Sequence, residues 1–311
     1  MNFLKKYKKK AKILLLGGAK PGEGLIVKFI FYALLIAIGF VYLYPLLYML
    51  ANSFMNMSDL ISSSIRWLPS GLYLENYRRA LQIMDVGNTF WQTILVAGLP
   101  SILQTISTAV VGYGFARFEF PGRRIFFVLM LATFIIPPQI TMIPRYLLFS
   151  RLEMLGTFYT FVIPAALAQG LRNAIFILIF YQMFKQIPGA LIEAGKIDGA
   201  GTFKIFYKIA VPLSIPAIVI VFLFSFVWYW NETYLASVYF GNVLKTLPLA
   251  LQNFADSFSQ MQSGGDTPLN QLNEAITMAG TLLTISPLLV LYFVLQRWFV
   301  ESVDRTGITG E

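Results

Sequence analysis

Few residues in this 311-residue chain are suited to chemistry, and those few favour binding over bond breaking. Histidine and cysteine are both absent, which removes the commonest general base, the usual zinc ligands and any thiolate nucleophile. We therefore predict no catalytic residue and no metal site. The polar residues that stand out are Arg172 and the run Trp230-Asn231-Glu232, because each lies within a long apolar stretch or at its end.

The elements that must position these residues are predicted to be membrane-spanning helices. Apolar residues make up 57% of the sequence and charged residues 13%, and the mean hydropathy is +0.67, values far from those of a soluble domain. Apolar runs near the length of about 20 residues that a bilayer requires predict an all-α polytopic protein. Its six spans are expected at 25–51, 89–115, 125–149, 158–183, 213–236 and 275–297. Prolines inside these runs are expected to interrupt them, at Pro45, Pro137, Pro138, Pro144, Pro164 and Pro287.

The distribution of basic residues predicts the orientation of these spans. If the amino terminus lies inside, the inner segments carry 17 Lys and Arg residues and the outer segments carry six. Short loops rich in Lys and Arg stay in the cytoplasm, so both termini are expected to be cytoplasmic. The net charge of +9 does not indicate nucleic acid, because seven of the 24 basic residues lie in the first 20 positions, where they suit a membrane flank.

The chain is expected to form three parts. Residues 1–24 form a basic cytoplasmic arm; its apolar run is only four residues long, Ile13 to Leu16, too short for a signal peptide. Residues 25–297 form the six-helix domain, and residues 298–311 form a cytoplasmic tail. Two long outer segments, 52–88 and 237–274, are either ordinary solvated connections or surfaces for an extracellular partner.

The inner segment 185–212 is longer than a simple connection requires. Its pattern predicts a short helix from Pro188 to Ile197, a turn at Asp198-Gly199, and a second amphipathic helix that opens after Thr202 as its N-cap. Pro212 is expected in the first turn of the fifth span. Such a helix pair offers a docking surface, although it is also compatible with an amphipathic loop that lies on lipid.

The spacing of this segment resembles the EAA loop of bacterial ABC importer permeases. The matching residues are Glu193, Ala194, Gly195, Asp198, Gly199, Ala200, Ile209 and Pro212. Other segments are similar to the carbohydrate-importing class that contains the shorter maltose permease subunit: Tyr44-Pro45-Leu46, Tyr113-Gly114-Phe115-Ala116-Arg117-Phe118, Pro137-Pro138, Ile143-Pro144, Trp230-Asn231-Glu232 and Arg297-Trp298-Phe299-Val300. Gly195 replaces the alanine usual in the family and is expected to loosen the first loop helix, since glycine costs about 1 kcal/mol relative to alanine.

The resemblance implies a type I ABC importer permease fold in the bacterial inner membrane. The loop would insert into a cytoplasmic ATPase subunit, with Glu193 as a charged anchor and the two alanines permitting close approach. The implied partners are a second homologous permease, two ATPase subunits, an extracellular or periplasmic solute-binding protein and a carbohydrate, moved by alternating access. No phosphate-binding P-loop is present in the sequence, so ATP and Mg²⁺ are expected on the partners, with no enzyme activity, cofactor or nucleic acid in this chain.

Two other classes fit the composition less well. An ion-coupled secondary transporter is the alternative function, but it is expected to carry intramembrane acidic or histidine relay groups, and the predicted spans have almost none apart from Glu232. An intramembrane protease would need a Ser-His dyad or paired aspartates within its spans. The absence of histidine excludes the first, and no predicted span carries the second.

Arg172 has two interpretations. An arginine inside a membrane costs at least about 2.5 kcal/mol unless its guanidinium faces protein, water or a counter-ion. As a structural residue, it would bond to the backbone carbonyls of a broken helix or to a carboxylate of the partner permease. As a substrate residue, its planar guanidinium would hold a carboxylate through two hydrogen bonds, and this interpretation predicts an acidic saccharide.

Trp230, Asn231 and Glu232 are a second candidate for the substrate pathway. An aromatic ring can stack on the apolar face of a sugar, and amide or carboxylate groups can bind its hydroxyls. The alternative is an aromatic-belt tryptophan with a helix-capping amide, a common arrangement at membrane interfaces. The sequence alone leaves both interpretations open.

Overall fold

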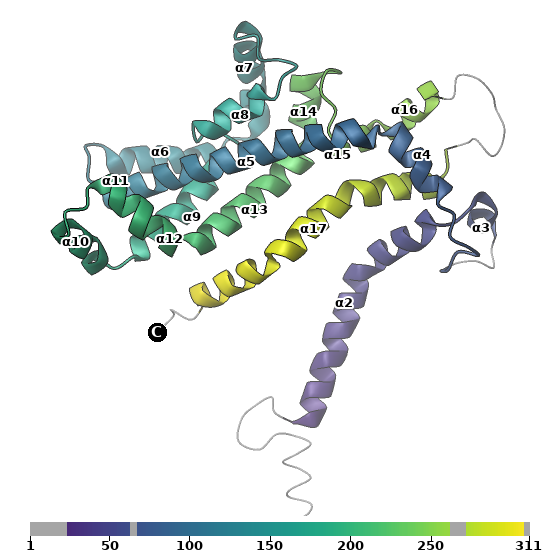
Figure 1. The fold of residues 1–311 in the computed structure, drawn as a ribbon, viewed down its shortest axis with the longest axis horizontal. Coiled ribbons are helices and arrows are strands. Elements are labelled where there is room, and N and C mark those ends of the chain that lie inside the picture. Colours follow the sequence, from purple (N-terminus) through teal and green to yellow (C-terminus); the bar gives the residue numbers. More distant parts are fainter. Residues whose placement is uncertain (1–23, 63–66, 262–271, 308–311) are drawn as a thin grey trace, which may run out of the picture. The chain divides into compact units, whose positions relative to one another are not determined.

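The computed structural model describes residues 24–62, 67–261 and 272–307, and within these ranges the chain forms helices and no strand (Figure 1). The expected all-α class is thereby confirmed. The chain divides into two compact units, Met1–Tyr77 with Asn273–Ala279 and Arg78–Leu272 with Gly280–Glu311, and each is described by itself. Residues 1–23 of the predicted basic arm and residues 262–271 of the outer segment 237–274 lie outside the described residues.

Three of the predicted spans are continuous helices. They are α2 (Leu25–Ser53), α5 (Val86–Arg117) and α17 (Glu274–Gly307), and each is long and apolar enough to cross a membrane. The remaining helices are shorter: α3 (Met57–Ile61), α4 (Glu75–Ile83), α6 (Arg123–Ile135), α7 (Pro138–Arg151), α8 (Tyr159–Ala166), α9 (Asn173–Gln186), α10 (Gly189–Ile197), α11 (Thr202–Ile205), α12 (Val211–Leu213), α13 (Ile215–Asn231), α14 (Thr233–Phe240), α15 (Leu247–Gln252) and α16 (Phe254–Met261).

The other three predicted spans are each divided into two helices. The third is α6 followed by α7, bent by 100°. The fourth is α8 followed by α9, and the fifth is α13 followed by α14. The sharply bent helix pairs are Arg123–Ile135 with Pro138–Arg151, Asn173–Gln186 with Gly189–Ile197, and Thr202–Leu213 with Ile215–Asn231. If each of these pairs is counted as one span, the described residues contain up to six candidate spans.

Proline explains only one of these breaks. At Pro137-Pro138 the residue before each proline is extended, with ψ of 120° at Ile136 and 133° at Pro137, because the proline ring disfavours helical geometry in the preceding residue. The expected interruptions at the other prolines were wrong. Pro45, Pro144, Pro164 and Pro287 each lie inside a continuous helix, as neighbouring groups in membrane helices allow.

In the first unit, α2 leads into a connection that is folded around buried polar side chains. Asn76 is buried and donates from Nδ2 to the carbonyls of Ser53 and Met55, at 2.9 and 2.8 Å. The Ser53 and Tyr77 hydroxyls lie 2.8 Å apart, and buried Asp59 accepts from the Ser70 hydroxyl at 2.7 Å. Because these bonds satisfy groups that burial removes from water, this part of segment 52–88 is an ordered element.

In the second unit, α5 is the central helix and contacts α8, α9 and α13 (Figure 1). Its buried stripe consists mostly of small or hydroxyl side chains, which allow neighbouring helices to approach closely. Thr105 and Thr108 donate to carbonyls one turn earlier on α5 itself, so these hydroxyls are satisfied without a partner on another helix. The residues of this stripe are Thr89, Thr93, Val96, Ala97, Pro100, Ser101, Gln104, Thr105, Thr108, Ala109, Gly112 and Tyr113.

Gly112 marks the closest approach of α5 to α9. A Cβ added there would lie 2.6 Å from the Phe180 Cβ and 3.1 Å from the Ile177 carbonyl oxygen. These atoms belong to the backbone of α9 or adjoin it, so rotation of a side chain cannot relieve the overlap. Two residues further on, a Cβ at Gly114 would meet nothing within 4 Å.

This contrast gives a matched pair of variants. Gly112→Ala is expected to destabilise the protein by about 1–3 kcal/mol because it overpacks the helix contact. Gly114→Ala is expected to be neutral or slightly stabilising, since alanine is the better helix former. The measurement is the thermal unfolding midpoint of the purified protein, and equal midpoints for the two variants would contradict the packing described here.

Candidate functional site

The segment 185–212 is a folded helix pair. The first predicted helix is confirmed as α10, and the chain reverses at Asp198-Gly199 as predicted. Gly199 has φ of +72°, its amide donates to the Lys196 carbonyl, and the Ala200 amide donates to the Gly195 carbonyl at 2.9 Å. These two bonds form a Schellman motif, which requires a left-handed residue that glycine adopts at low cost.

The second half of the segment differs from the prediction in two details. Thr202 is not an N-cap: Gly201 occupies that position, and Thr202 is the first residue of α11. Pro212 does not lie in the main helix of the fifth span, because α12 ends at Leu213 and α13 begins at Ile215. Between α11 and α12, the π-helix at Phe206–Ala210 widens the turn that precedes Pro212, which lacks a backbone donor.

Gly195 has a packing role that its helix propensity does not describe. It is buried against the second half of the loop, where an added Cβ would lie 2.9 Å from Ile209 Cδ1 and 3.5 Å from Ile205 Cγ1. The absent side chain therefore lets α10 approach α11 and the π-helix closely. Glu193, Ala194 and Asp198 are exposed, whereas Ala200 and Ile209 are half-buried.

The outer surface of this loop exposes three large apolar side chains among charged ones. Ile197 is 85% exposed, Phe203 81% and Tyr207 65%. Phe203 and Tyr207 are four residues apart and so lie near one face of a helix. Because large apolar side chains gathered on one exposed element mark an interaction surface, the loop is suited to docking.

The inner surface of the same loop is attached to the helices of the second unit. The Phe206 ring lies 4.8 Å from the Tyr113 ring of α5 and 6.0 Å from the Phe184 ring of α9, measured between centroids. Arg117, the last residue of α5, donates from Nη2 to the carbonyls of Phe184 and Ile187. This guanidinium adds a charged donor at the end of α9, where the Phe184 carbonyl also accepts from the Ile187 amide at 3.4 Å.

The other end of α9 begins at a break in the fourth predicted span. Residues 167–172 are not helical, and Ala168 and Arg172 have φ of 54° and 51°, a conformation that non-glycine residues adopt at a cost of about 1–3 kcal/mol. Gln104 donates to the Leu171 carbonyl at 2.6 Å, and the Tyr229 hydroxyl accepts from the Leu171 amide at 3.2 Å. Both polar side chains are buried, so they replace the bonds that the broken helix lacks.

Glycine is required inside this break. A Cβ at Gly170 would lie 2.4 Å from the Tyr229 hydroxyl oxygen and 2.5 Å from Gln104 Oε1. Asn173 closes the break from the other side by donating to the Ala168 carbonyl at 2.6 Å. The non-helical backbone is thus held by side chains from three helices.

Arg172 is the N-cap residue of α9 and is exposed. Its Cζ lies 5.0 Å from the centroid of the Trp228 ring, within the range of a cation–π contact. Its guanidinium forms no hydrogen bond or ion pair with the residues that the structure describes. The helix is broken here, but Arg172 does not bond to its carbonyls, so that form of the structural interpretation is corrected.

The run Trp230-Asn231-Glu232 is only partly open to a ligand. Trp230 is 1% exposed and packs on Phe226 with 5.5 Å between ring centroids, so the stacking interpretation is corrected for this ring, which has no free face. Glu232 Oε1 accepts from the Leu235 amide at 2.9 Å and caps α14. Asn231 is exposed and donates to the Val227 carbonyl at 2.8 Å.

The sequence alone does not predict the positioning roles of Arg117, Gln104, Gly170 and Tyr229. One signal was present for Gln104: it lies in a stripe of hydroxyl and amide residues inside an apolar run, at Ser101, Gln104, Thr105 and Thr108. Polar residues at helical spacing within a span predict a buried face. No comparable signal distinguished Tyr229 from its aromatic neighbours.

The sequence of this chain is similar to those of several known proteins. The family described as binding-protein-dependent transport system inner membrane component matches residues 108–305. The osmoprotective compounds uptake permease protein GgtD of Synechocystis is 31% identical over 277 residues, covering 86% of this chain and 88% of that protein. The arabinooligosaccharides transport system permease protein AraQ of Halalkalibacterium halodurans is 28% identical over 281 residues, covering 88% of this chain and 93% of that protein.

A solved structure has the same fold. A chain of a bacterial ABC transporter involved in the import of the acidic polysaccharide alginate superposes with a TM-score of 0.67 and 22% identity, covering 88% of this chain and 96% of that chain. This likeness confirms the expected fold.

The contact of Arg117 with the end of α9 yields a prediction. Arg117→Gln is expected to loosen the start of α10, because two hydrogen bonds to a charged donor, worth about 1.5–3 kcal/mol each, are removed. Hydrogen exchange measured by mass spectrometry should show faster exchange of the amides from Gly189 to Ile197. Arg117→Lys should be intermediate, because an ammonium group keeps the charge but not the planar fork. Exchange at the original rate in Arg117→Gln would contradict this role.

Proposed function

The chain belongs to the family of binding-protein-dependent transport system inner membrane components, and from this premise we propose that it is a permease subunit of an ATP-driven ABC importer for a sugar or oligosaccharide. Transport would proceed by alternating access. The relative named as an uptake permease for osmoprotective compounds supports an import role, and the relative named as a permease for arabinooligosaccharides supports a carbohydrate substrate. An ion-coupled secondary transporter is not favoured by this family membership.

The observation that carries the proposal is the folded loop between α9 and α13. Its outer surface exposes Ile197, Phe203 and Tyr207, and its inner surface is tied to α5 and α9 through Phe206 and Arg117. A rigid element with an apolar outer face is suited to insertion into a cleft on a cytoplasmic ATPase subunit. Closure of the ATPases would then push on the helices of the permease.

The rest of the assembly follows from this arrangement. One loop per permease and two ATPase sites require a second homologous permease, and a solute-binding protein outside the cell would deliver the substrate. ATP and Mg²⁺ would be bound by the ATPase subunits. The excess of basic residues in the segments that include Arg123, Lys185 and Lys204 supports a cytoplasmic position for the loop and for both termini.

The docking role of the loop is tested at Phe203. Phe203→Asp is expected to weaken binding of the ATPase subunits at least about thirtyfold, because truncation of an aromatic anchor costs about 2 kcal/mol or more and the carboxylate would enter an apolar cleft. Co-purification of the ATPase subunits and ATP hydrolysis by the reconstituted complex are the measurements.

The matched control is Val243→Asp. Val243 is also a large exposed apolar residue, 71% exposed, and follows α14. It should leave ATPase binding unchanged. If Phe203→Asp retains the ATPase subunits with the original affinity, the loop does not dock through this face.

The break before α9 is the best-supported part of a substrate pathway. Discontinuous membrane helices direct the positive ends of their half-helices at anionic substrate groups. Here Arg172 adds a full positive charge at such an end, and no carboxylate among the described residues neutralises it. These features support an acidic saccharide as the substrate, with Asn231 and Glu232 as further candidates for contacts with its hydroxyls.

Substrate charge is tested with Arg172 variants in the reconstituted complex, using neutral and acidic oligosaccharides delivered by the cognate binding protein. Arg172→Gln is expected to reduce stimulation of ATP hydrolysis by the acidic sugar about tenfold or more, since hydrogen bonds to charged groups are worth about 1.5–3 kcal/mol. Stimulation by a neutral sugar should not change. Arg172→Lys should be intermediate, and equal stimulation of Arg172→Gln by the acidic sugar would reject the carboxylate contact.

A further inference from the structure

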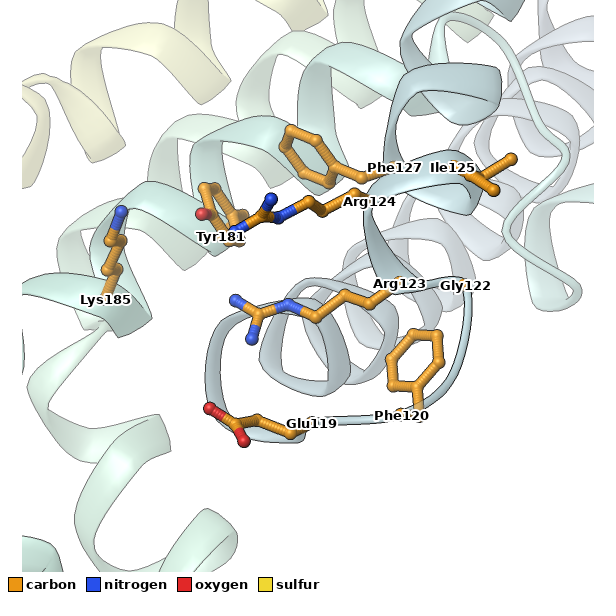
Figure 2. Close-up of a pocket in the computed structure, with 9 residues that line it drawn as sticks. All are labelled: Glu119, Phe120, Gly122, Arg123, Arg124, Ile125, Phe127, Tyr181 and Lys185. Carbon is orange, nitrogen blue, oxygen red and sulfur yellow. The ribbon is translucent and has the colours of Figure 1, made fainter.

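A basic cavity lies where α6 begins beside the end of α9 (Figure 2). Its volume is about 740 Å³. The residues that matter for its chemistry are Glu119, Arg123, Arg124, Phe127, Tyr181 and Lys185. All of them belong to the second unit. Neither the docking surface nor the break at 167–172 includes them.

The positive charges around this cavity lie at the positive end of the α6 helix dipole, which repels them. Helix α6 begins with Arg123 and Arg124, it has no acidic residue in its first turn, and its N-cap Gly122 provides no side-chain bond. Positive side chains at a helix N-terminus add to the positive end of the dipole, where anions are favoured instead. With Lys185 there are three cations and one carboxylate, Glu119, around the cavity, and none of these groups forms an ion pair with a residue that the structure describes.

The cavity is lined by charged groups at one end and by aromatic rings along one wall. Figure 2 shows the side chains of Arg123 and Arg124 extending from the start of α6 into the cavity that Tyr181 and Glu119 also line. The Phe127 and Tyr181 rings lie 4.7 Å apart between centroids, and Lys185 Nζ lies 5.6 Å from the centroid of the Tyr181 ring. Rings that bound a cationic site at the end of a membrane helix are typical of the headgroup region.

The apolar wall continues along α6. No residue of α6 is buried, and Ile125 and Phe126 are 66% and 56% exposed. A ligand whose charged group contacts the arginines would therefore have an apolar surface directly beside it. This combination of an anionic group and a hydrocarbon chain is that of a phospholipid, whereas free phosphate would use only the charged end.

We propose that this cavity binds the phosphate of an anionic phospholipid, with Arg123, Arg124 and Lys185 around the phosphate and one acyl chain along α6. Basic pockets between membrane helices bind lipid headgroups in this way. An acidic segment of a partner protein would satisfy the charges, but it would not account for the exposed apolar face of α6 that begins at the same place. The proposal does not depend on which substrate is transported or on how the loop couples to ATP.

The test is native mass spectrometry of the detergent-purified transport complex titrated with phosphatidylglycerol, with phosphatidylcholine of the same acyl chains as the neutral lipid. Each of Arg123→Gln and Arg124→Gln should weaken phosphatidylglycerol binding about fivefold, and the double variant about thirtyfold. Phosphatidylcholine binding should not change. Arg151→Gln removes the same charge from the exposed end of α7 and should have no effect.

Glu119→Gln is a variant whose expected effect is tighter binding and not a loss of binding. It removes the only carboxylate from the cavity, so phosphatidylglycerol should bind more tightly, by up to about fivefold. Inorganic phosphate at the same concentrations should not displace the lipid, and displacement would assign the site to a free anion. Original affinity in the double arginine variant would overturn the proposal. The proposal would also be overturned if that variant lost the ATPase subunits but still bound phosphatidylglycerol. The cavity would then be a contact with a protein.

Discussion

Both ends of α9 are held by polar side chains of α5, and the arrangement of the second unit depends on this pair of contacts. Gln104 binds the Leu171 carbonyl just before α9 begins, and Arg117 binds carbonyls at its other end. Inside a membrane an unsatisfied backbone group costs several kcal/mol, so each contact fixes where the helix can start and stop. The spacing agrees: Gln104 and Arg117 are about 20 Å apart along α5, and the 14 residues of α9 span about 21 Å.

Close packing between these two ends makes α5 and α9 a single mechanical element. Gly112 allows the backbones to approach, and the buried rings of Phe176, Phe180 and Phe184 fill the space between α5, α9 and α13. Well-packed interiors deform little and transmit strain. A displacement at one end of α9 is therefore expected to reach the other, which places the docking loop and the break with Arg172 at opposite ends of the same rigid helix pair.

The sequence predicts the elements of this arrangement better than their interruptions. Apolar runs located α2, α5 and α17, and the Asp198-Gly199 dipeptide located the turn in the loop, because these features depend on residues close in the chain. The break at 167–172 depends on Gln104 and Tyr229, each more than 50 residues away, and no local pattern encodes it. The same reason explains Trp230: the sequence left a sugar-stacking ring and an interfacial ring equally open, and packing against Phe226 buries it. Proline was an unreliable guide, since membrane helices tolerate it where neighbouring groups compensate.

The contacts of the loop with α5 and α9 are expected to make the loop move together with these helices. If α10 were linked to α9 only through the extended Ile187-Pro188 connection, a push on its outer face would be absorbed by rotation about that connection. Three attachments prevent this: Gly195 packs α10 on Ile205 and Ile209, Phe206 packs on Tyr113, and Arg117 holds the Ile187 carbonyl. Together these contacts restrict rotation about the connection. Force applied to Phe203 or Ile197 is thus directed into α5 and α9, which is the property that a coupling element between an ATPase and a transport pathway requires.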